Sequence, residues 1–268
     1  MQKRIYLGTQ GWNYEGWIGP FYPPGSKAKE MLSLYAEVFD TVEVDSTFYA
    51  IPAENSVKGW AARTPTDFKF SLKLPSEITH KNRLRESEGL LEQFIDRVSL
   101  LGPKLGCVLI QLPPDFSPNE QAAFGNFMDL LPSQPRFAVE FRDATWLNLE
   151  TVKILARKNV ALTLTDSRWV HRTISFRFIE DYPADFAYVR WLGPRELTDY
   201  SRIQFDRSKE LAQWGEAFAA LQAKASEIFG YFNNHFQGHS PASCNLFKEL
   251  IGMPTIPPAS LIKQPSLF

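Results

Sequence analysis

Carboxylate and cationic side chains recur at the ends of several β-rich segments of this chain, where they could act together. Glu43 and Glu140 form the first candidate pair, because two carboxylates about 5–9 Å apart suit acid/base or glycosidase-type chemistry. Lys73 and Arg142 occupy similar positions, and nearby cations lower the pKa values of carboxylates and favour their ionised forms. Asp166, also at a segment end, completes the set of candidate catalytic residues. The alternative is structural, with Glu140 held in an ion pair by Lys73 or Arg142.

The same segment ends carry the side chains expected of an anion site. Lys73, Arg142 and Arg190 can converge on a phosphate or carboxylate, groups that arginine binds through two parallel hydrogen bonds. The segment 233–240 leads into the last expected helix, whose N-terminus could bind phosphate or could simply be capped by this loop. Aromatic loop residues offer stacking surfaces for sugars or bases, unless they only pack the loops onto the body of the protein. The candidate ligand-binding residues are Trp12, Tyr14, Tyr49, Gln111, Arg142, Trp146, Arg190, Asn233, Asn234 and His235.

The chain offers few metal ligands. It contains 4 histidines, and neither an HxH nor an HxxE spacing occurs. Glu43, Glu140, Asp166 and His235 form one set that could coordinate a divalent ion, but cations nearby would repel that ion. A GxSxG motif is absent, and the 2 cysteines lie far apart without a CxxC spacing. We therefore expect neither a metal nor a resident cofactor.

These side chains need a scaffold that brings segment ends together, and the order of the segments predicts one. Short β-rich runs alternate with helix-like stretches along the whole chain, which is typical of parallel βαβ units. About eight such runs in 268 residues fit a single (β/α)8 TIM-like barrel spanning residues 1–268, of the α/β class. An open doubly wound sheet is the alternative, but no GxGxxG turn follows the first run. The segment 167–183 lacks a clear helix, so we expect an irregular sixth unit.

The alternation of residues within each run predicts which side chains face inward. In the run 136–142, Phe137 and Val139 share one face, whereas Glu140 and Arg142 share the other. The polar face then points into the barrel, near the carboxyl ends of the strands, where barrel active sites are built. The expected strands span 4–10, 41–46, 68–74, 106–112, 136–142, 160–166, 186–191 and 228–233. The expected helices span 28–39, 87–101, 120–131, 147–158, 209–224 and 241–250.

Composition limits the classes of partner. Hydrophobic residues make up 44% and charged residues 22%, as in ordinary globular proteins. The net charge of −1 gives no overall basic field, so nucleic-acid binding would need a local patch. The apolar runs are too short for a membrane span, and the low cysteine content and the lack of a signal peptide favour the cytoplasm. The basic residues available for a local patch are Lys81, Arg83, Arg85, Arg168, Arg172 and Arg177.

Several longer motifs occur in order along nearly the whole chain. They include 8–14 (GTQGWNY), 17–23 (WIGPFYP), 42–49 (VEVDSTFY), 111–114 (QLPP), 140–142 (EFR) and 231–234 (YFNN). Together they resemble the motifs of the YecE-like TIM-barrel family, which is also called domain of unknown function 72. The resemblance implies a TIM-like barrel and brings no established reaction. Gln10, Asp45 and Asp143 depart from the residues usual at these positions in the family.

These observations lead to one functional hypothesis and two alternatives. We expect an enzyme, a hydrolase or isomerase, that uses acid/base chemistry on a small anionic or polyhydroxylated ligand at the carboxyl mouth of the barrel. The ligand would be phosphate-, sugar- or nucleotide-like. The first alternative is a non-catalytic module that binds nucleic acid, a nucleotide or a protein. The second is a structural or interaction role with an inactive pocket.

Overall fold

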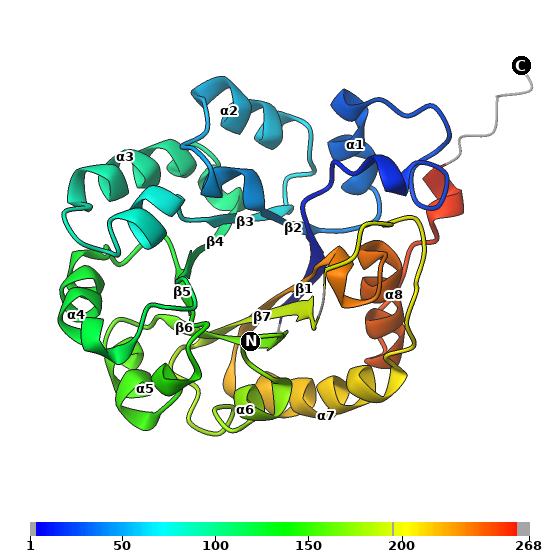
Figure 1. The fold of residues 1–268 in the computed structure, drawn as a ribbon. Coiled ribbons are helices and arrows are strands. Elements are labelled where there is room, and N and C mark those ends of the chain that lie inside the picture. Colours follow the sequence, from blue (N-terminus) through cyan, green and yellow to red (C-terminus); the bar gives the residue numbers. More distant parts are fainter. Residues whose placement is uncertain (1–3, 195, 262–268) are drawn as a thin grey trace, which may run out of the picture.

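Eight parallel strands form a closed barrel in a computed structural model that describes residues 4–194 and 196–261. The strands follow one another around the ring in sequence order, and β8 pairs with β1 to close it (Figure 1). This architecture confirms the predicted (β/α)8 barrel. The strands are β1 (Arg4–Gln10), β2 (Thr41–Val44), β3 (Lys69–Lys73), β4 (Leu105–Gln111), β5 (Phe137–Glu140), β6 (Ala161–Ser167), β7 (Phe186–Gly193) and β8 (Glu227–Phe232).

Helices surround the barrel and cover the outer face of the strands (Figure 1). They are α1 (Ala28–Tyr35), α2 (Glu54–Ala62), α3 (Glu88–Ser99), α4 (Gln121–Leu130), α5 (Leu149–Ala156), α6 (Arg172–Phe176), α7 (Ser208–Lys224) and α8 (Ser240–Leu250). Helix α6 has only 5 residues, which matches the irregular sixth unit expected from the sequence. Helix α2 was not among the expected helices, because it buries only Val57 and Trp60 and contains a glycine.

The alternating side chains build two separate apolar layers. On β5, Phe137 and Val139 belong to the layer between strands and helices, whereas Ala138 belongs to the barrel interior. Aromatic rings fill the interior near the amino ends of the strands, where Tyr6 stacks on Phe229. The amino end of the interior is therefore occupied by apolar and aromatic side chains.

The C-terminal segment that follows α8 is described as far as Leu261, which is buried in the outer apolar layer. The rest of the segment, residues 262–268, lies outside the described part of the chain. Among the described residues, no helix is both long enough and apolar enough to span a membrane.

Candidate functional site

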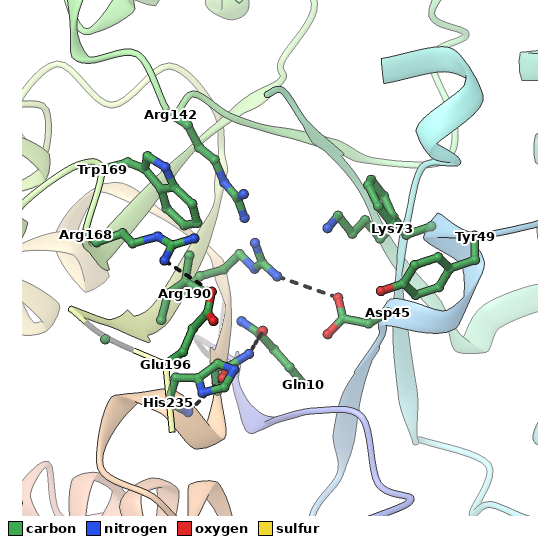
Figure 2. Close-up of a pocket in the computed structure, with 14 residues that line it drawn as sticks. Gln10, Asp45, Tyr49, Lys73, Arg142, Arg168, Trp169, Arg190, Glu196 and His235 are labelled. Atoms are coloured by element: carbon green, nitrogen blue, oxygen red, sulfur yellow. Dashed lines mark hydrogen bonds and ion pairs between the residues drawn. The ribbon is translucent and has the colours of Figure 1, made fainter. Parts of the chain in front are cut away.

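A cavity of about 240 Å³ opens at the carboxyl ends of the strands. Charged side chains reach it from several walls, and Figure 2 shows Arg142 and Lys73 pointing into it from opposite sides. Tyr49 lies at its rim and is 82% exposed. The lining residues are Gln10, Asp45, Phe48, Tyr49, Lys73, Arg142, Arg168, Trp169, Arg190, Leu192, Gly193, Glu196, Asn233 and His235.

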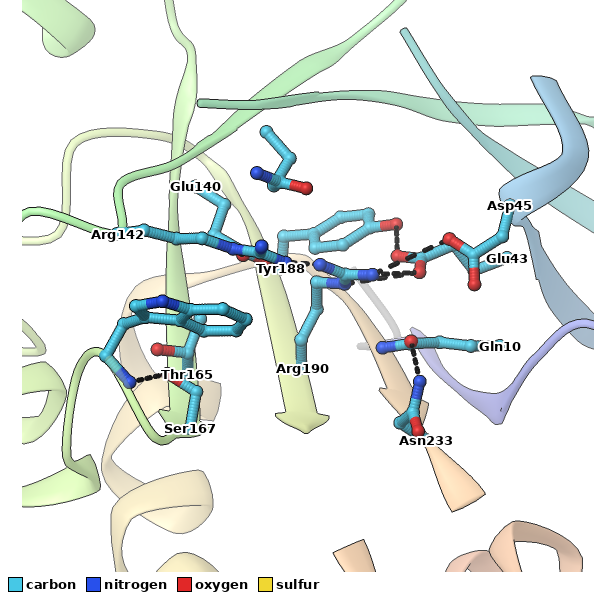
Figure 3. A network of polar contacts seen from close by, with 12 residues as sticks. Gln10, Glu43, Asp45, Glu140, Arg142, Thr165, Ser167, Tyr188, Arg190 and Asn233 are labelled. Atoms are coloured by element: carbon cyan, nitrogen blue, oxygen red, sulfur yellow. Dashed lines mark hydrogen bonds and ion pairs between the residues drawn. The ribbon is translucent and has the colours of Figure 1, made fainter. Parts of the chain in front are cut away.

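Arg190, on β7, lies at the floor of the cavity and binds two buried carboxylates (Figure 3). Its Nη2 donates to Oε1 of Glu43 at 2.7 Å, and its Nη1 donates to Oε2 of Glu140 at 2.5 Å. Glu43 also accepts a hydrogen bond of 2.6 Å from the hydroxyl of Tyr188. Neither glutamate lines the cavity, and both are buried on either side of the guanidinium that they contact (Figure 3). The structure thus gives Glu43 and Glu140 supporting positions without direct access to a ligand.

The two buried glutamates differ in their acidity. Burial raises the pKa of Glu43 to about 7, against the opposing effect of Arg190, and the nearby Asp45 adds to the increase. Burial also tends to raise the pKa of Glu140, but the positive charges of Arg190 and Arg142 outweigh burial and hold this pKa below its ordinary value. The pKa lowering that we expected from nearby cations is therefore found for Glu140 but not for Glu43, whose pKa is raised. At neutral pH Glu140 is ionised, whereas Glu43 is in its titration range.

Arg142 forms a fixed cationic wall. Its Nε donates to Oε1 of Glu140 at 3.1 Å, and its guanidinium carbon lies 3.7 Å from the ring centroid of Trp169. Ser167 positions that ring, since its Oγ accepts hydrogen bonds from the backbone N–H groups of Trp169 and Val170. The two terminal nitrogens of Arg142 have no hydrogen-bond partner among the described residues. They are therefore available to a ligand, and their orientation is already set.

Lys73 forms the opposite wall at the end of β3. Its side chain makes no hydrogen bond or ion pair within the described part of the chain, and Nζ lies 3.9 Å from the centroid of the Phe48 ring. Burial lowers the pKa of Lys73 to about 8; Asp45 opposes this effect, whereas Arg190 and Arg142 add to it. At pH 7 about a tenth of such amines are unprotonated. The cavity thus contains an amine that can act as either acid or base near neutrality.

A chain of amide and ring contacts forms a third wall. Asn233 donates to Oε1 of Gln10 at 2.6 Å, whereas Nε2 of the buried Gln10 has no partner in the described structure. Nδ1 of His235 accepts a hydrogen bond from the backbone N–H of Leu197 at 3.0 Å, so the ring proton resides on Nε2. Burial also lowers the pKa of His235 and favours the neutral ring. His235 therefore supplies a neutral donor at the cavity, whereas Nε2 of Gln10 is buried beneath the cavity surface.

Of the fourteen predicted site residues, the structure brings six together at the cavity. Those six are Tyr49, Lys73, Arg142, Arg190, Asn233 and His235. Five others belong to the packing of the loops or to the barrel interior. Trp12 packs edge-on against Trp60, and Asn234 accepts a hydrogen bond from Ser240 at the start of α8. The other three donate hydrogen bonds to backbone carbonyls: Tyr14 to Gln10, Gln111 to Leu112, and Trp146 to Phe116.

The Asn234 contact bears on the predicted phosphate site at the last helix. Its Oδ1 accepts hydrogen bonds from both the backbone N–H and the hydroxyl of Ser240, and from Nε1 of Trp17. The amide thus occupies the place at the start of α8 where an anion would bind. This loop caps the helix, as the structural alternative expected.

The expectation that Asp166 faces the cavity needs correction. Ala161 faces the barrel interior and Leu164 faces the helices, so strand alternation places Asp166 on the helix side with Leu164. Its carboxylate accepts a 3.3 Å hydrogen bond from Trp214 and lies 3.7 Å from Arg172 and 3.8 Å from Arg207. Asp166 is therefore a buried ion-pair partner between β6 and the helices.

The cavity also contains residues that were not among the candidate site residues. Gln10 shares the inward face of β1 with Tyr6, so the alternation rule could have found it. Trp169 and Arg168 lie in the irregular sixth unit, where no periodic pattern indicates the direction of a side chain. The remaining lining residues outside the candidate set are Asp45, Phe48, Leu192, Gly193 and Glu196; among them, Asp45 follows the inward face of its strand and Phe48 belongs to the aromatic loop residues.

Neither a metal centre nor a basic groove is apparent in the described residues. They contain no group of three or more His, Cys, Asp or Glu side chains that could hold an ion. Five of the six candidate basic-patch residues have carboxylate partners, among them Arg83 and Arg85, which share Glu120. Such pairing leaves little free positive charge for a nucleic-acid backbone.

Comparison with known proteins gives consistent matches. A family model described as "Protein of unknown function DUF72" matches residues 6–265. The chain is 33% identical over 172 residues to the UPF0759 protein YecE of Escherichia coli (strain K12), an alignment that covers 62% of this chain and only 61% of YecE. It is 26% identical over 270 residues to the UPF0759 protein YunF of Bacillus subtilis (strain 168), covering 92% of this chain and 94% of YunF. The crystal structure of a DUF72 family protein from Thermotoga maritima MSB8 superposes with a TM-score of 0.79 at 25% identity, covering 93% of this chain and 99% of that chain.

Proposed function

Because the chain belongs to the DUF72 family of proteins of unknown function, its activity has to be inferred from its pocket, and we propose that this pocket binds a small anionic ligand and carries out acid/base chemistry on it. The ligand class is a compact molecule with a phosphate or carboxylate group, matched to a cavity of about 240 Å³. A hydroxyl group on the same molecule would meet the neutral Nε2–H donor of His235.

One observation supports the anion most strongly. Arg142 and Lys73 enter the same cavity from opposite walls, and their terminal nitrogens have no protein partner among the described residues (Figure 2). A further cation, Arg190 at the floor of the cavity, is already neutralised by its ion pairs with Glu43 and Glu140. A guanidinium fixed by Glu140 and Trp169 loses little conformational freedom when it binds an anion, which favours affinity.

The acid/base roles fall to Asp45 and Lys73. Asp45 is the carboxylate that follows β2 at the cavity wall, and its side chain is 35% exposed. Lys73, with a pKa of about 8, can exchange a proton with a bound ligand near neutral pH. A glycosidase-type pair of Glu43 and Glu140 is disfavoured, since both bind one guanidinium and neither reaches the cavity. Proton transfer on an anionic ligand, as in an isomerase, fits this geometry better.

Calorimetric titration with inorganic phosphate and with small carboxylates tests the anion site. Arg142→Ala should weaken binding about tenfold to a hundredfold, because it removes a charged hydrogen-bond donor. Arg202→Ala is the matched control, since the side chain of Arg202 is 77% exposed and its partner is Asp199. Equal affinity in the wild type and in Arg142→Ala, or no binding of either anion class, would overturn the proposal.

A second measurement tests the chemistry. Hydroxy acids, keto acids and sugar phosphates that bind are incubated in D2O, and deuterium incorporation next to their carbonyl or hydroxyl carbons is followed by NMR. We expect exchange with the wild-type protein and its loss in Asp45→Asn. If the ligands bind and no deuterium is incorporated, the acid/base role is incorrect and a binding module is the better description.

A further inference from the structure

The environment of the Lys73 amine differs from that of an ordinary lysine. Its side chain is only 8% exposed, yet it lines the cavity. No carboxylate or carbonyl of the described residues holds the amine; its contact is the face of the Phe48 ring, 3.9 Å from Nζ. Lys69, on the same strand, shows the usual arrangement, since its amine donates to the carbonyl of Pro103. An unheld amine facing an open cavity is a group that can react with a ligand.

We propose that Lys73 is a nucleophile that forms an imine with the carbonyl carbon of a small anionic aldehyde or ketone. This inference rests on the proposed function, because it assigns the anion of that ligand to Arg142. The substrate class is a carbonyl compound with a carboxylate or phosphate a few bonds away, which includes α-keto acids and phosphorylated sugars in their open-chain form.

The geometry gives each part of such a molecule a partner. The anionic group would meet the terminal nitrogens of Arg142, whose position is fixed by Glu140 and Trp169. Lys73 lies across the cavity and can reach a carbonyl carbon in its middle (Figure 2). The Nε2–H group of His235, which lines the cavity, supplies a further donor for a hydroxyl or carbonyl oxygen. The ligand would thus be held at one end while its carbonyl carbon faces the amine.

The covalent step balances without any further reactant. The lone pair of the Lys73 nitrogen attacks the carbonyl carbon, and the electron pair of the C=O bond moves to oxygen, which takes up a proton from the solvent that enters the open cavity. The resulting carbinolamine transfers a proton from nitrogen to a base and gains one on its hydroxyl. The hydroxyl leaves as water, and the nitrogen lone pair closes the C=N bond. Asp45, which lines the same cavity, can accept the proton from nitrogen and return it to the departing oxygen.

The electrostatic surroundings favour the neutral amine that this attack requires. Burial against Phe48 and the positive charges of Arg190 and Arg142 all lower the pKa of Lys73, which reaches about 8. Desolvation and a neighbouring cation are the two usual means by which proteins activate a lysine nucleophile. The imine also carries its positive charge near Asp45 and Glu140, the carboxylates that act on Lys73.

Reductive trapping tests the inference. The full chain is incubated with pyruvate or with dihydroxyacetone phosphate in the presence of sodium cyanoborohydride, and adducts are located by mass spectrometry of peptides. We expect one main adduct, on Lys73, in the wild type and in the matched control Lys69→Arg, and none at position 73 in Lys73→Arg. Uncharged dihydroxyacetone should react at least tenfold more slowly than its phosphate, since Arg142 holds only the anionic form. The two anionic probes show whether a carboxylate or a phosphate is preferred.

The pH dependence separates this amine from surface lysines. The rate of trapping at Lys73 should rise with pH and level off at about pH 8, whereas the rate at an ordinary lysine levels off near pH 10.5. Adducts spread over many lysines, or none at Lys73, would overturn the inference. If phosphate binding still depends on Arg142 in that case, the proposed function stands. Trapping at Lys73 without Arg142-dependent anion binding would support the nucleophile and overturn the anion site.

Discussion

Tyr188 donates a 2.6 Å hydrogen bond to a carboxylate oxygen of Glu43, deep in the barrel and out of contact with solvent. Arg190 binds the other oxygen of the same carboxylate. These two contacts favour the charged form, yet burial outweighs them and leaves Glu43 with a pKa of about 7. The free energy of unfolding should therefore depend on pH through this residue.

The sign of that dependence follows from proton binding. Between the ordinary pKa of 4.5 and the folded value of about 7, the folded state holds more protons at Glu43 than the unfolded state does. The stabilising contribution is complete below pH 4.5 and is lost as the pH rises to about 7. We expect the free energy of unfolding to fall by on the order of 1–3 kcal/mol across this window relative to Glu43→Gln. Urea unfolding of both proteins at several pH values measures the difference, and parallel curves would contradict it. Glu140 contributes little to the pH dependence in this window, because its pKa in the folded state is lowered and it therefore titrates below pH 4.5.

Removing the guanidinium of the floor should destabilise the whole barrel. Arg190→Met leaves Glu43 and Glu140 buried without their shared cation, and an unpaired buried charge costs about 3–5 kcal/mol. Chemical denaturation at pH 7 should show this loss, and a smaller one at pH 5, where Glu43 is protonated. Arg202→Met provides the control, since its exposed ion pair contributes about 0–1 kcal/mol. Similar stability of the two variants would mean that the floor does not depend on its charges.

Gly193 allows the end of β7 to pass close to the loop that carries His235. Its φ angle is +82°, and a Cβ atom there would lie 2.3 Å from the carbonyl oxygen of His235. Gly193→Ala should therefore cost about 2 kcal/mol or more and weaken phosphate binding by displacing His235. Gly125→Ala is the matched control, because a Cβ on that α4 residue meets no atom within 4 Å, and it should be neutral or stabilising by about 0.5–1 kcal/mol. Thermal unfolding and calorimetry distinguish the two, and a well-tolerated Gly193→Ala would argue against the close approach.

Trp169 should affect affinity more than stability. Its ring is half-buried and supports the guanidinium of Arg142, a type of contact that contributes about 0.5–2 kcal/mol. Trp169→Leu should accordingly weaken phosphate binding about 2-fold to 30-fold, whereas Trp169→Phe should retain most of the affinity. Calorimetric titration of both variants, alongside their melting temperatures, tests this. An equal loss in both variants, or a loss explained by unfolding, would exclude the stacking role.

The barrel and its strand order could be predicted from the sequence because alternating faces and short apolar runs carry the information. The same alternation could have placed more of the site than it did. Counting from Ala161 assigns Asp166 to the helix side, and counting from Tyr6 assigns Gln10 to the interior. Asp166 was taken to face inward because it is a polar residue at a strand end, and Gln10 was left out of the candidate site, since positions were not counted along these two strands.

Other features of the site could not be predicted from local patterns. Trp169 and Glu196 lie in loops whose course depends on long-range contacts, such as the hydrogen bond from Leu197 to His235. The contrast between the pKa values of Glu43 and Glu140 depends on their distances to Arg190 and Arg142, which only the folded arrangement defines. Aromatic loop residues pack in the same way in many proteins, so the type of residue alone did not separate Tyr49 from Trp12.

The contacts of Arg190 also bear on the order in which the protein acquires its properties. Its carboxylate partners lie 147 and 50 positions earlier in the sequence, on β2 and β5. These contacts cannot form before β7 has been synthesised, and contacts between such distant positions also form slowly, because long loops have to close first. A growing chain on the ribosome that has not yet released β7 lacks this cation, so neither Glu43 nor Glu140 has its ion-pair partner. Competence to take up a ligand is therefore acquired at a late stage of synthesis, when the ring is nearly complete.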